Sequence, residues 1–343
     1  MDLFLAIILM TLIMLWTMIL GMRLGKQASS SSQFGVQMLV VGVSCFYFLF
    51  LWNRPCLTRW LPHAALIILA NWQAVIGSFF AGMYLSSGRI GRKRRLIVGP
   101  MTLVLAGYSI VAPVLGNAPT CIPASSASPL ITQTTPYTCS PAAAASLLRL
   151  HGIPATESKM ADLCLTRRGT HWMGVYRGLK LMTQRTPWKV VAESFSRKTL
   201  LSLHEAPALL SVDIDTDLIA AGYDHGFRGN TGHSVLALGA GGGDDVMVFD
   251  PAPSYGIECW DREILSWVSE GVILRLVRRD GSKRDAAVST RIRRATLQTD
   301  KFSYISWKLR MKTGSQWKSL ETGRQPILAR VTGSMEFTTE SRN

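Results

Sequence analysis

The sequence predicts two parts of different architecture, an all-α membrane-spanning part followed by an α+β globular domain. Hydrophobic residues make up 48% of the 343 residues and charged residues only 17%, a balance that excludes a disordered chain. Four long apolar runs all lie before residue 117, and helix patterns followed by strand patterns begin from about residue 130. The length agrees with two domains of about 150 residues each.

The net charge of +15 is concentrated at the two ends of the chain. Residues 1–116 hold nine Lys and Arg against one acid, and residues 281–343 hold thirteen against five. Residues 117–280 are almost neutral, with fifteen basic and sixteen acidic residues. A nucleic-acid enzyme concentrates its basic charge around its active surface. We therefore expect no nucleic-acid partner.

The four apolar runs cover residues 3–22, 36–52, 62–85 and 97–116. A bilayer core of about 30 Å needs roughly 20 helical residues, and the run at 36–52 lies at the short end of the tolerated range. Each run is predicted to be a helix, because every backbone polar group in lipid needs a partner within its own segment. No charged residue interrupts these runs, so we expect a four-helix anchor in the lipid bilayer rather than a transport path.

Flanking charges predict the orientation of this anchor. Asp2 precedes the first run and Arg23 and Lys26 follow it, so the run lacks the basic start of a cleavable signal peptide. The loop before the fourth run contains Arg89, Arg92, Lys93, Arg94 and Arg95. The positive-inside rule places this loop in the cytoplasm and everything after the fourth helix on the extracytoplasmic side.

The remainder of the chain divides into a linker, a domain and a tail. Residues 117–129 are rich in Pro, Ser and Ala and are predicted to be a linker. Residues 130–280 show helix patterns at 141–151 and 173–183 and strand patterns at 234–240 and 246–250, an α+β arrangement. The basic residues 281–343 fit a small β extension, a membrane-surface segment or a largely disordered tail.

Cys139 has the setting of a nucleophilic thiol. Ser140, Pro141 and a run of strong helix formers follow it, which predicts that it lies at a helix amino terminus. Unpaired backbone N–H groups and the helix dipole favour a thiolate at that position. A cysteine before a helix is more often a small buried residue, so its neighbours decide between these interpretations.

His233 and Asp250 are the neighbours that favour chemistry. His233 lies at the start of one predicted strand and Asp250 at the end of the next, with a glycine-rich hairpin between them. An imidazole beside Cys139 takes the thiol proton, and a carboxylate on the far ring nitrogen fixes the orientation of the ring. Gln133, six residues before Cys139, is close enough to direct its amide at an oxyanion.

The blocks QTTPYTCSPAAAASLLRLHG, GHSVLALG and VMVFDPA follow one another within residues 130–280. Together they resemble the papain-like cysteine peptidases that trim double-glycine leaders from bacteriocins, family thirty-nine of the cysteine class. The resemblance implies a papain-like fold and a peptide substrate cut after small residues such as Gly-Gly. It also implies Cys139 as nucleophile, His233 as general base and acid, Asp250 as its orienting partner and Gln133 in the oxyanion hole.

The chain departs from this family in three respects. Ser140 stands where the family usually has Gly, and it either crowds the oxyanion site or adjusts the turn. No phosphate loop of the GxxxxGK[ST] type occurs, so any peptide exporter is a separate partner. The domain follows its membrane helices and is predicted to lie outside, so it meets substrates during or after translocation.

Other motifs give no support for a cofactor or a metal, and we expect neither. GAGGGD at 239–244 precedes a predicted strand rather than a helix, so a hairpin explains it better than a dinucleotide loop. Asp213, Asp215, Asp217 and Asp224 loosely match a calcium loop that has Leu218 where Gly is needed. Cys121, Cys164 and Cys259 leave open one disulfide in an oxidising compartment.

These observations favour a membrane-anchored thiol protease, a hydrolase with a Cys/His/Asp triad. The alternative is a catalytically silent module that binds leader peptides for a separate exporter. A papain-like amidase acting on cell-wall peptides fits the predicted location, but no motif supports it.

Overall fold

The computed structural model describes residues 2–27, 30–88, 91–123, 128–195, 207–214, 232–242, 245–253, 255–260, 265, 268–281, 286–299, 305–313, 316–325 and 337–339. The chain forms two compact units, Met1–Asn117 and Ala118–Asn343. We describe each unit by itself.

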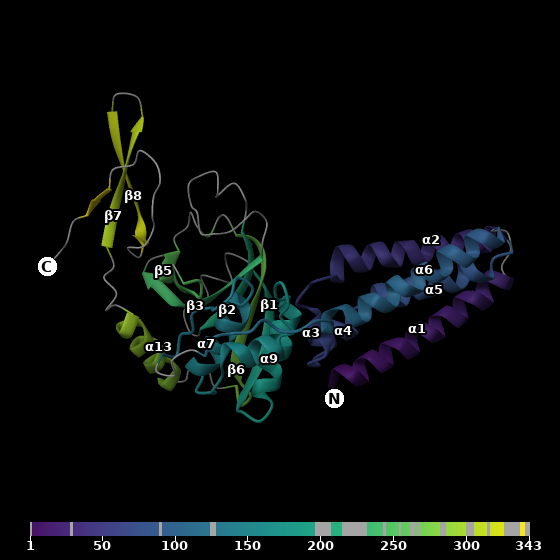
Figure 1. The fold of residues 1–343 in the computed structure, drawn as a ribbon, viewed down its shortest axis with the longest axis horizontal. Helices are drawn as coiled ribbons and strands as arrows, with labels where there is room; N and C mark the ends of the chain where they lie inside the picture. The colour runs from purple at the N-terminus through teal and green to yellow at the C-terminus, as the bar shows by residue number, and fades with distance from the viewer. Residues whose placement is uncertain are drawn as a thin grey trace. The chain divides into compact units, whose positions relative to one another are not determined.

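In the first unit the described residues form helices joined by short turns, with no strand among them (Figure 1). Among its long helices, α1 packs along α5, and α5 packs along α6. A π-helical turn at Tyr47–Leu51 continues α2, and a 3₁₀ turn at Ala112–Val114 ends α6. The helices are α1 (Asp2–Gln27), α2 (Ser30–Phe46), α3 (Leu57–Trp60), α4 (Leu66–Leu69), α5 (Trp72–Ser86) and α6 (Arg92–Val111).

Three helical stretches are long and apolar enough to cross a membrane, namely Asp2–Lys26, Leu66–Ser86 and Arg92–Val114. They correspond to three of the four predicted spans and are compatible with a membrane protein. The predicted span at 36–52 is the shorter apolar helix Gly35–Leu51, so a bundle of four spans is not confirmed. Its length is limited because Asn53, which has a positive φ of 61°, and Pro55 follow it directly.

Helices α1 and α5 approach each other closely. A side chain at Gly82 of α5 would collide with the backbone carbonyl of Met18 in α1. Nearby, the buried hydroxyls of Thr17 and Ser78 lie 2.9 Å apart and join the same two helices. Small residues and interhelical hydrogen bonds of this kind hold helices together where lipid removes the hydrophobic drive for association.

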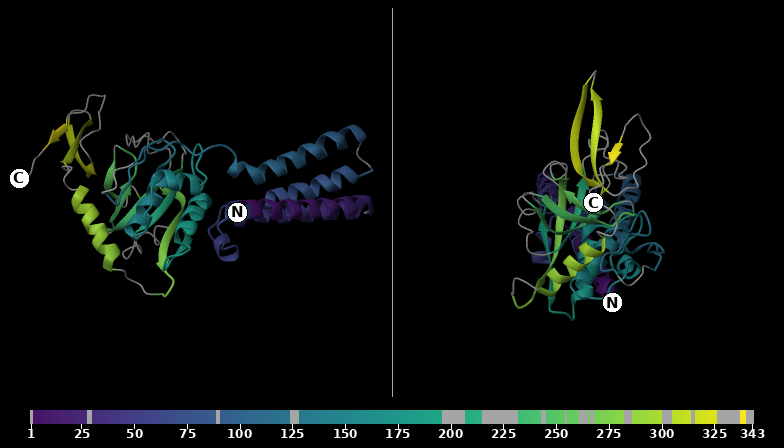
Figure 2. Two further views of the ribbon diagram at one scale, coloured as in Figure 1. Left: turned by 60° about the horizontal axis from the view of Figure 1, so that its bottom comes forward. Right: turned by 90° about the vertical axis from the view of Figure 1, so that its left-hand side faces the viewer.

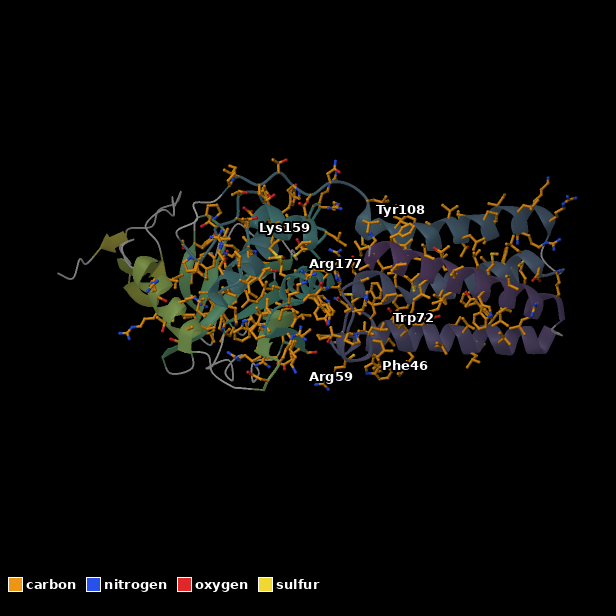
Figure 3. The ribbon with its side chains drawn as sticks, turned by 90° about the horizontal axis from the view of Figure 1, so that it is seen from below. Phe46, Arg59, Trp72, Tyr108, Lys159 and Arg177 are labelled. Carbon is orange, nitrogen blue, oxygen red and sulfur yellow. The ribbon has the colours of Figure 1, made fainter. Side chains whose placement is uncertain are left out.

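Large apolar side chains cover the outside of this unit. In Figure 3, Phe46, Trp72 and Tyr108 extend from α2, α5 and α6, and all three are more than one-third exposed. Trp72 begins α5 and Tyr108 lies near the end of α6, and the Asn71 amide donates to Ser109 O between these two helix ends. Aromatic side chains at one end of a helix bundle are typical of a membrane–water interface.

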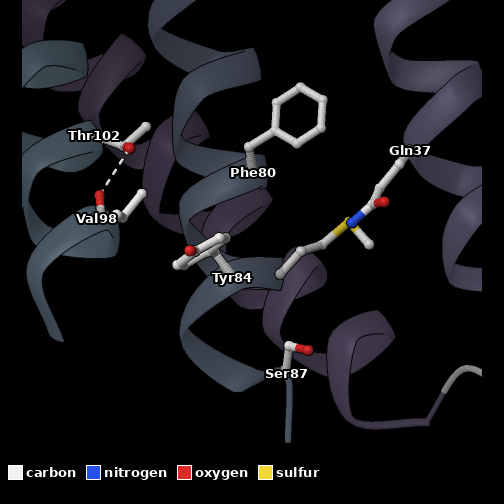
Figure 4. Close-up of a pocket in the computed structure, with 7 residues that line it drawn as sticks. Gln37, Phe80, Tyr84, Ser87, Val98 and Thr102 are labelled. Carbon is white, nitrogen blue, oxygen red and sulfur yellow. Dashed lines mark hydrogen bonds between the residues drawn. The ribbon is translucent and has the colours of Figure 1, made fainter. Parts of the chain in front are cut away.

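A pocket between α2, α5 and α6 contains no charged side chain among its lining residues (Figure 4). The Thr102 hydroxyl in this pocket donates to its own helix at Val98 O, at 2.8 Å. The lining residues are Gln37, Phe80, Met83, Tyr84, Ser87, Val98 and Thr102.

The second unit is built on a six-stranded antiparallel sheet with the strand order β1-β6-β2-β3-β4-β5 (Figure 1). This mixture of helices and an antiparallel sheet agrees with the predicted α+β class. One sheet face packs on a core of buried apolar side chains that includes Leu210, Val235, Val248 and Ile273. The strands are β1 (Trp188–Ser194), β2 (Ala208–Ile214), β3 (Gly232–Gly242), β4 (Asp245–Asp250), β5 (Gly256–Trp260) and β6 (Val268–Arg278).

The described part of this unit contains α7 (Cys139–Leu150), α8 (Glu157–Leu163), α9 (Trp172–Thr183) and α13 (Ala286–Thr299). Helix α13 is yellow-green in Figure 2. Helix α7 contacts β2, β3 and β4, and α13 contacts α7. Gly152 ends α7 with a φ of +78°, a conformation that glycine adopts without strain. Arg291 of α13 then donates to Leu150 O at the end of α7. A second sheet, in the order β8-β7-β9, follows α13 with β7 (Ile305–Thr313), β8 (Gln316–Gln325) and β9 (Phe337–Thr339).

Candidate active site

Cys139 is the first residue of α7 and is half-buried. The turn before it is held by Thr138, whose fully buried hydroxyl donates to Thr135 O at 3.0 Å and accepts from Thr135 N at 3.2 Å. The first N–H groups of a helix have no partner within it. Cys139 therefore occupies the amino-terminal position that its sequence predicted.

Glu157 attaches the segment before this turn to α8. Its buried carboxylate accepts from Thr134 N at 2.8 Å and from the Thr134 hydroxyl at 2.9 Å. Farther back, the Ser146 hydroxyl of α7 accepts from Ile131 N at 2.8 Å. The backbone that leads to the thiol is thus fixed on both sides of Gln133.

His233 and Asp250 lie together on neighbouring strands, as predicted. His233 Nε2 is 3.0 Å from Asp250 Oδ2, and the two residues are only 7% and 1% exposed. Leu236 pairs with Phe249 across β3 and β4, so continuing the register by one pair makes Asp250 a diagonal neighbour of His233 on one sheet face. The other carboxylate oxygen, Oδ1, accepts from Ala252 N at 2.8 Å.

The Cys139 thiol is hydrogen-bonded to the His233 side chain, across 94 residues of sequence. Because Nε2 faces Asp250, Nδ1 is the ring nitrogen left for the sulfur. Burial raises the pKa of the Cys139 thiol, but the hydrogen bond and charge of His233 lower it, with smaller contributions from Ser234 N–H and the Ser140 hydroxyl. The net shift of the Cys139 pKa is downward.

The pKa of His233 moves in the opposite direction. Burial lowers it, but the charge and hydrogen bond of Asp250, followed by those of Cys139, raise it to about 10. A lowered thiol pKa beside a raised imidazole pKa favours the thiolate–imidazolium form near neutral pH. The two groups titrate as a coupled pair.

Gln133 is bonded both to the segment that follows Asp250 and to the turn that precedes Cys139. Its backbone N–H donates to Pro251 O at 2.7 Å, directly after Asp250, and its side-chain amide donates to Thr135 O at 3.1 Å. The amide oxygen Oε1 is buried and has no hydrogen-bond partner among the described residues. In the part of the chain that the structure describes, no hydrogen bond joins Gln133 to Cys139.

Two features near the site are not evident from the sequence pattern. Ser234 donates its N–H to the sulfur, and its hydroxyl lies 2.7 Å from that of Ser140. Ser140 is thus turned toward β3. Glu258 of β5 is buried beside Asp250, and one of its oxygens accepts from Trp260 Nε1 at 3.1 Å. Burial and the charge of Asp250 raise the pKa of Glu258 to about 7, against smaller opposing effects of Trp260 and His233.

The other candidates from the sequence contribute nothing to this site. Cys121, Cys164 and Cys259 all lie among the described residues, and no disulfide joins any two of them. Asp215, Asp217, Leu218 and Asp224 of the calcium-like segment lie outside the described residues. The glycine-rich segment joins β3 to β4, as expected for a hairpin. No cluster of metal-binding side chains occurs within the described ranges.

Comparisons with known proteins find a distant similarity to solved structures. No family model matches the chain, and no curated protein matches it. The chain is similar to the peptidase domain of Streptococcus ComA, a bi-functional ABC transporter involved in a quorum-sensing pathway, with 18% identity and a TM-score of 0.34 over 44% of this chain and 98% of that one. A second similar structure, the peptidase domain of Streptococcus mutans ComA, has 18% identity and a TM-score of 0.27 over 43% and 98%.

Proposed function

We propose that this chain is a membrane-anchored cysteine endopeptidase. The observation that carries the proposal is the convergence of Cys139, His233 and Asp250, in which His233 lowers the pKa of the Cys139 thiol and His233 Nε2 lies 3.0 Å from Asp250 Oδ2. A nucleophile, a base and a group that orients the base are the parts required for covalent hydrolysis of an acyl bond. The three helical stretches that are long and apolar enough to cross a membrane support the proposed membrane anchor.

In this proposal the Cys139 thiolate attacks the carbonyl carbon of the scissile peptide bond, and the carbonyl oxygen becomes an oxyanion. Two donors near the nucleophile in sequence can stabilise this oxyanion. One is the backbone N–H of Cys139. The other is the side-chain amide of Gln133, which uses one of its two hydrogens to bond Thr135 O and has the second available. The C–N bond then breaks as the imidazolium of His233 gives its proton to the leaving amine. A thioester on Cys139 remains.

Water completes the reaction. His233, now neutral, takes a proton from water as the hydroxide adds to the thioester carbonyl. The C–S bond breaks, the carboxylic acid product leaves and the thiolate–imidazolium pair is restored. Asp250 keeps the imidazole in one orientation throughout, because Ala252 N and His233 hold its two oxygens.

The substrate we propose is a peptide cut after small residues, such as a leader that ends in Gly-Gly. The ComA structures are peptidase domains of a transporter. For this chain we propose a separate peptide exporter as the partner. The peptidase domain then meets its substrate on the extracytoplasmic side of the membrane. The alternative, a silent leader-binding module, requires peptide binding at the same site without turnover. It gains no support from a site that retains all three groups.

Hydrolysis by the full chain in detergent tests the proposal. A peptide containing a Gly-Gly leader is incubated with the unsubstituted chain and with Cys139→Ala, and products are identified by mass. Cys259→Ala is the matched control, because that half-buried cysteine lies on β5. We expect cleavage after Gly-Gly that requires Cys139 only. Binding without cleavage would support the silent module, and equal turnover by Cys139→Ala would contradict both interpretations.

A further inference from the structure

Two buried serines beside the sulfur have no part in the mechanism described above. Ser140 is the second residue of α7 and Ser234 follows His233 in β3, and they are 3% and 1% exposed. Their hydroxyl oxygens lie 2.7 Å apart. A buried hydroxyl needs a hydrogen-bond partner to offset its lost hydration, and these two partner each other across the helix–sheet interface.

Both serines also contact the sulfur. Ser140 Oγ lies 4.0 Å from Cys139 Sγ, the outer limit for a sulfur acceptor. The backbone N–H of Ser234 donates to the same sulfur. Together with His233, the sulfur is therefore faced by three groups that can donate hydrogen bonds.

We propose that Ser140 and Ser234 form a hydroxyl relay that stabilises the Cys139 thiolate and positions it against His233. The Ser234 hydroxyl donates to Ser140 Oγ, and the Ser140 hydroxyl donates to the sulfur. This inference rests on the proposed peptidase function. It makes both serines positioning residues that act on the nucleophile without touching the substrate.

The direction of the relay follows from charge. A thiolate accepts hydrogen bonds more strongly than a neutral hydroxyl does, so the Ser140 hydrogen turns to the sulfur once the proton has moved to His233. Ser140 Oγ then accepts from Ser234, and the two bonds polarise each other. Among the described residues, the charged groups around the sulfur are His233 on β3 and Asp250 behind it on β4, with Glu258 on β5 beyond Asp250.

The relay also joins the two elements that carry the reacting atoms. Cys139 lies on α7 and His233 lies on β3, and the Ser140–Ser234 bond connects the residues directly after each of them. A purely structural clamp would make the same contact without stabilising a thiolate. The pH dependence of thiol reactivity distinguishes these two roles, because a bond that stabilises the thiolate changes the pH at which the thiol reacts and a purely structural clamp does not.

The test measures alkylation of Cys139 by iodoacetamide across pH in the full chain. Chymotrypsin cleaves after Tyr137 and so separates Cys139 from Cys121 before mass analysis. The variants are Ser140→Ala, Ser234→Ala, the double variant and Ser234→Thr. Thr183→Ala is the matched control, because it removes a buried hydroxyl that donates to Leu179 O within α9. Thermal unfolding of each variant reports on folding.

We expect Ser140→Ala to slow alkylation about tenfold at about pH 6, because one charge-assisted hydrogen bond corresponds to roughly one pKa unit. Ser234→Ala should slow it about threefold alone and not at all in the Ser140→Ala background, since its hydroxyl acts through Ser140. Ser234→Thr should restore the rate, and Thr183→Ala should leave it unchanged.

An unchanged pH profile in folded Ser140→Ala or Ser234→Ala would overturn the relay while leaving the peptidase proposal intact. A Cys139 that fails to react at about pH 6 in the unsubstituted chain would overturn the peptidase proposal and the relay with it.

Discussion

The buried hydrogen bond between His233 Nε2 and Asp250 Oδ2, 3.0 Å long, joins the beginning of β3 to the end of β4. The hairpin between these strands determines the contact, because antiparallel register places both side chains on one sheet face. Both groups are almost inaccessible to solvent. Their interaction is therefore weakly screened and determines the protonation state of the imidazole.

Asp250→Asn tests this electrostatic role. Asparagine keeps the size of the side chain and removes its charge, so the pKa of His233 should fall from about 10 and the Cys139 pKa should rise. We expect peptide hydrolysis at neutral pH to fall about 100-fold or more. The pH profile of hydrolysis checks this result. Asp280→Asn is the control, since Asp280 is an exposed partner of Arg278, and equal profiles for both variants would remove Asp250 from the mechanism.

Gln133→Ala tests the proposed oxyanion donor. Loss of one oxyanion donor lowers kcat about 100-fold while leaving substrate binding largely unchanged. Steady-state kinetics measures kcat and KM separately. The exposed Gln184→Ala at the end of α9 is the matched control. A rise in KM at constant kcat would instead make Gln133 a substrate-binding residue.

Glu258→Gln tests the buried carboxyl beside Asp250. The unfolded chain releases this proton near pH 4.5 and the folded chain near about 7, so Glu258 lowers stability as pH rises between those values. The full effect above about pH 7 is on the order of 3 kcal/mol.

The Gln variant has no proton to release, so its unfolding temperature relative to the unsubstituted chain should rise between about pH 5 and about pH 8. Thermal unfolding at both pH values measures the difference. Glu193→Gln, which removes the partly exposed partner of Arg275, is the matched control. A constant difference for Glu258→Gln would mean that Glu258 is ionised in the folded chain over this whole pH range.

Gly82→Leu tests the packing of the helical unit. The new side chain would meet the Met18 carbonyl, so α1 and α5 must separate at a cost of about 2 kcal/mol or more. Gly107→Leu is the control, because nothing lies within 4 Å of that position in α6. Unfolding in detergent should distinguish the two variants, and equal stability would mean that α1 and α5 pack less closely.

Local patterns predicted most of the helices and strands that carry these residues. The helix formers after Pro141 indicated α7, which begins two residues earlier at Cys139, and the alternating apolar residues indicated β3 and β4. The predicted helix at 173–183 is confirmed as α9, one residue longer at its start. These elements follow from periodicity and turn chemistry, which depend on neighbouring residues alone.

Contacts between distant segments were harder to predict. Ser140 was noted as a departure from the family pattern, but its bond to Ser234 depends on how α7 packs on β3. Glu258 reaches Asp250 only through the pairing of β5 with β4. The second apolar run was predicted as a span from composition, whereas the helix it forms, Gly35–Leu51, is shorter than the other three stretches. Such features depend on tertiary packing, which a pattern along the chain does not contain.

The rate of Cys139 alkylation at about pH 6, compared with that of the exposed Cys56, tests most directly whether His233 activates this thiol. We predict that Cys139 reacts at least about tenfold faster than Cys56 and that His233→Ala abolishes the difference. If Cys139 reacts no faster than Cys56, and His233→Ala leaves its rate unchanged, then His233 does not activate Cys139 and the site is not that of a cysteine peptidase.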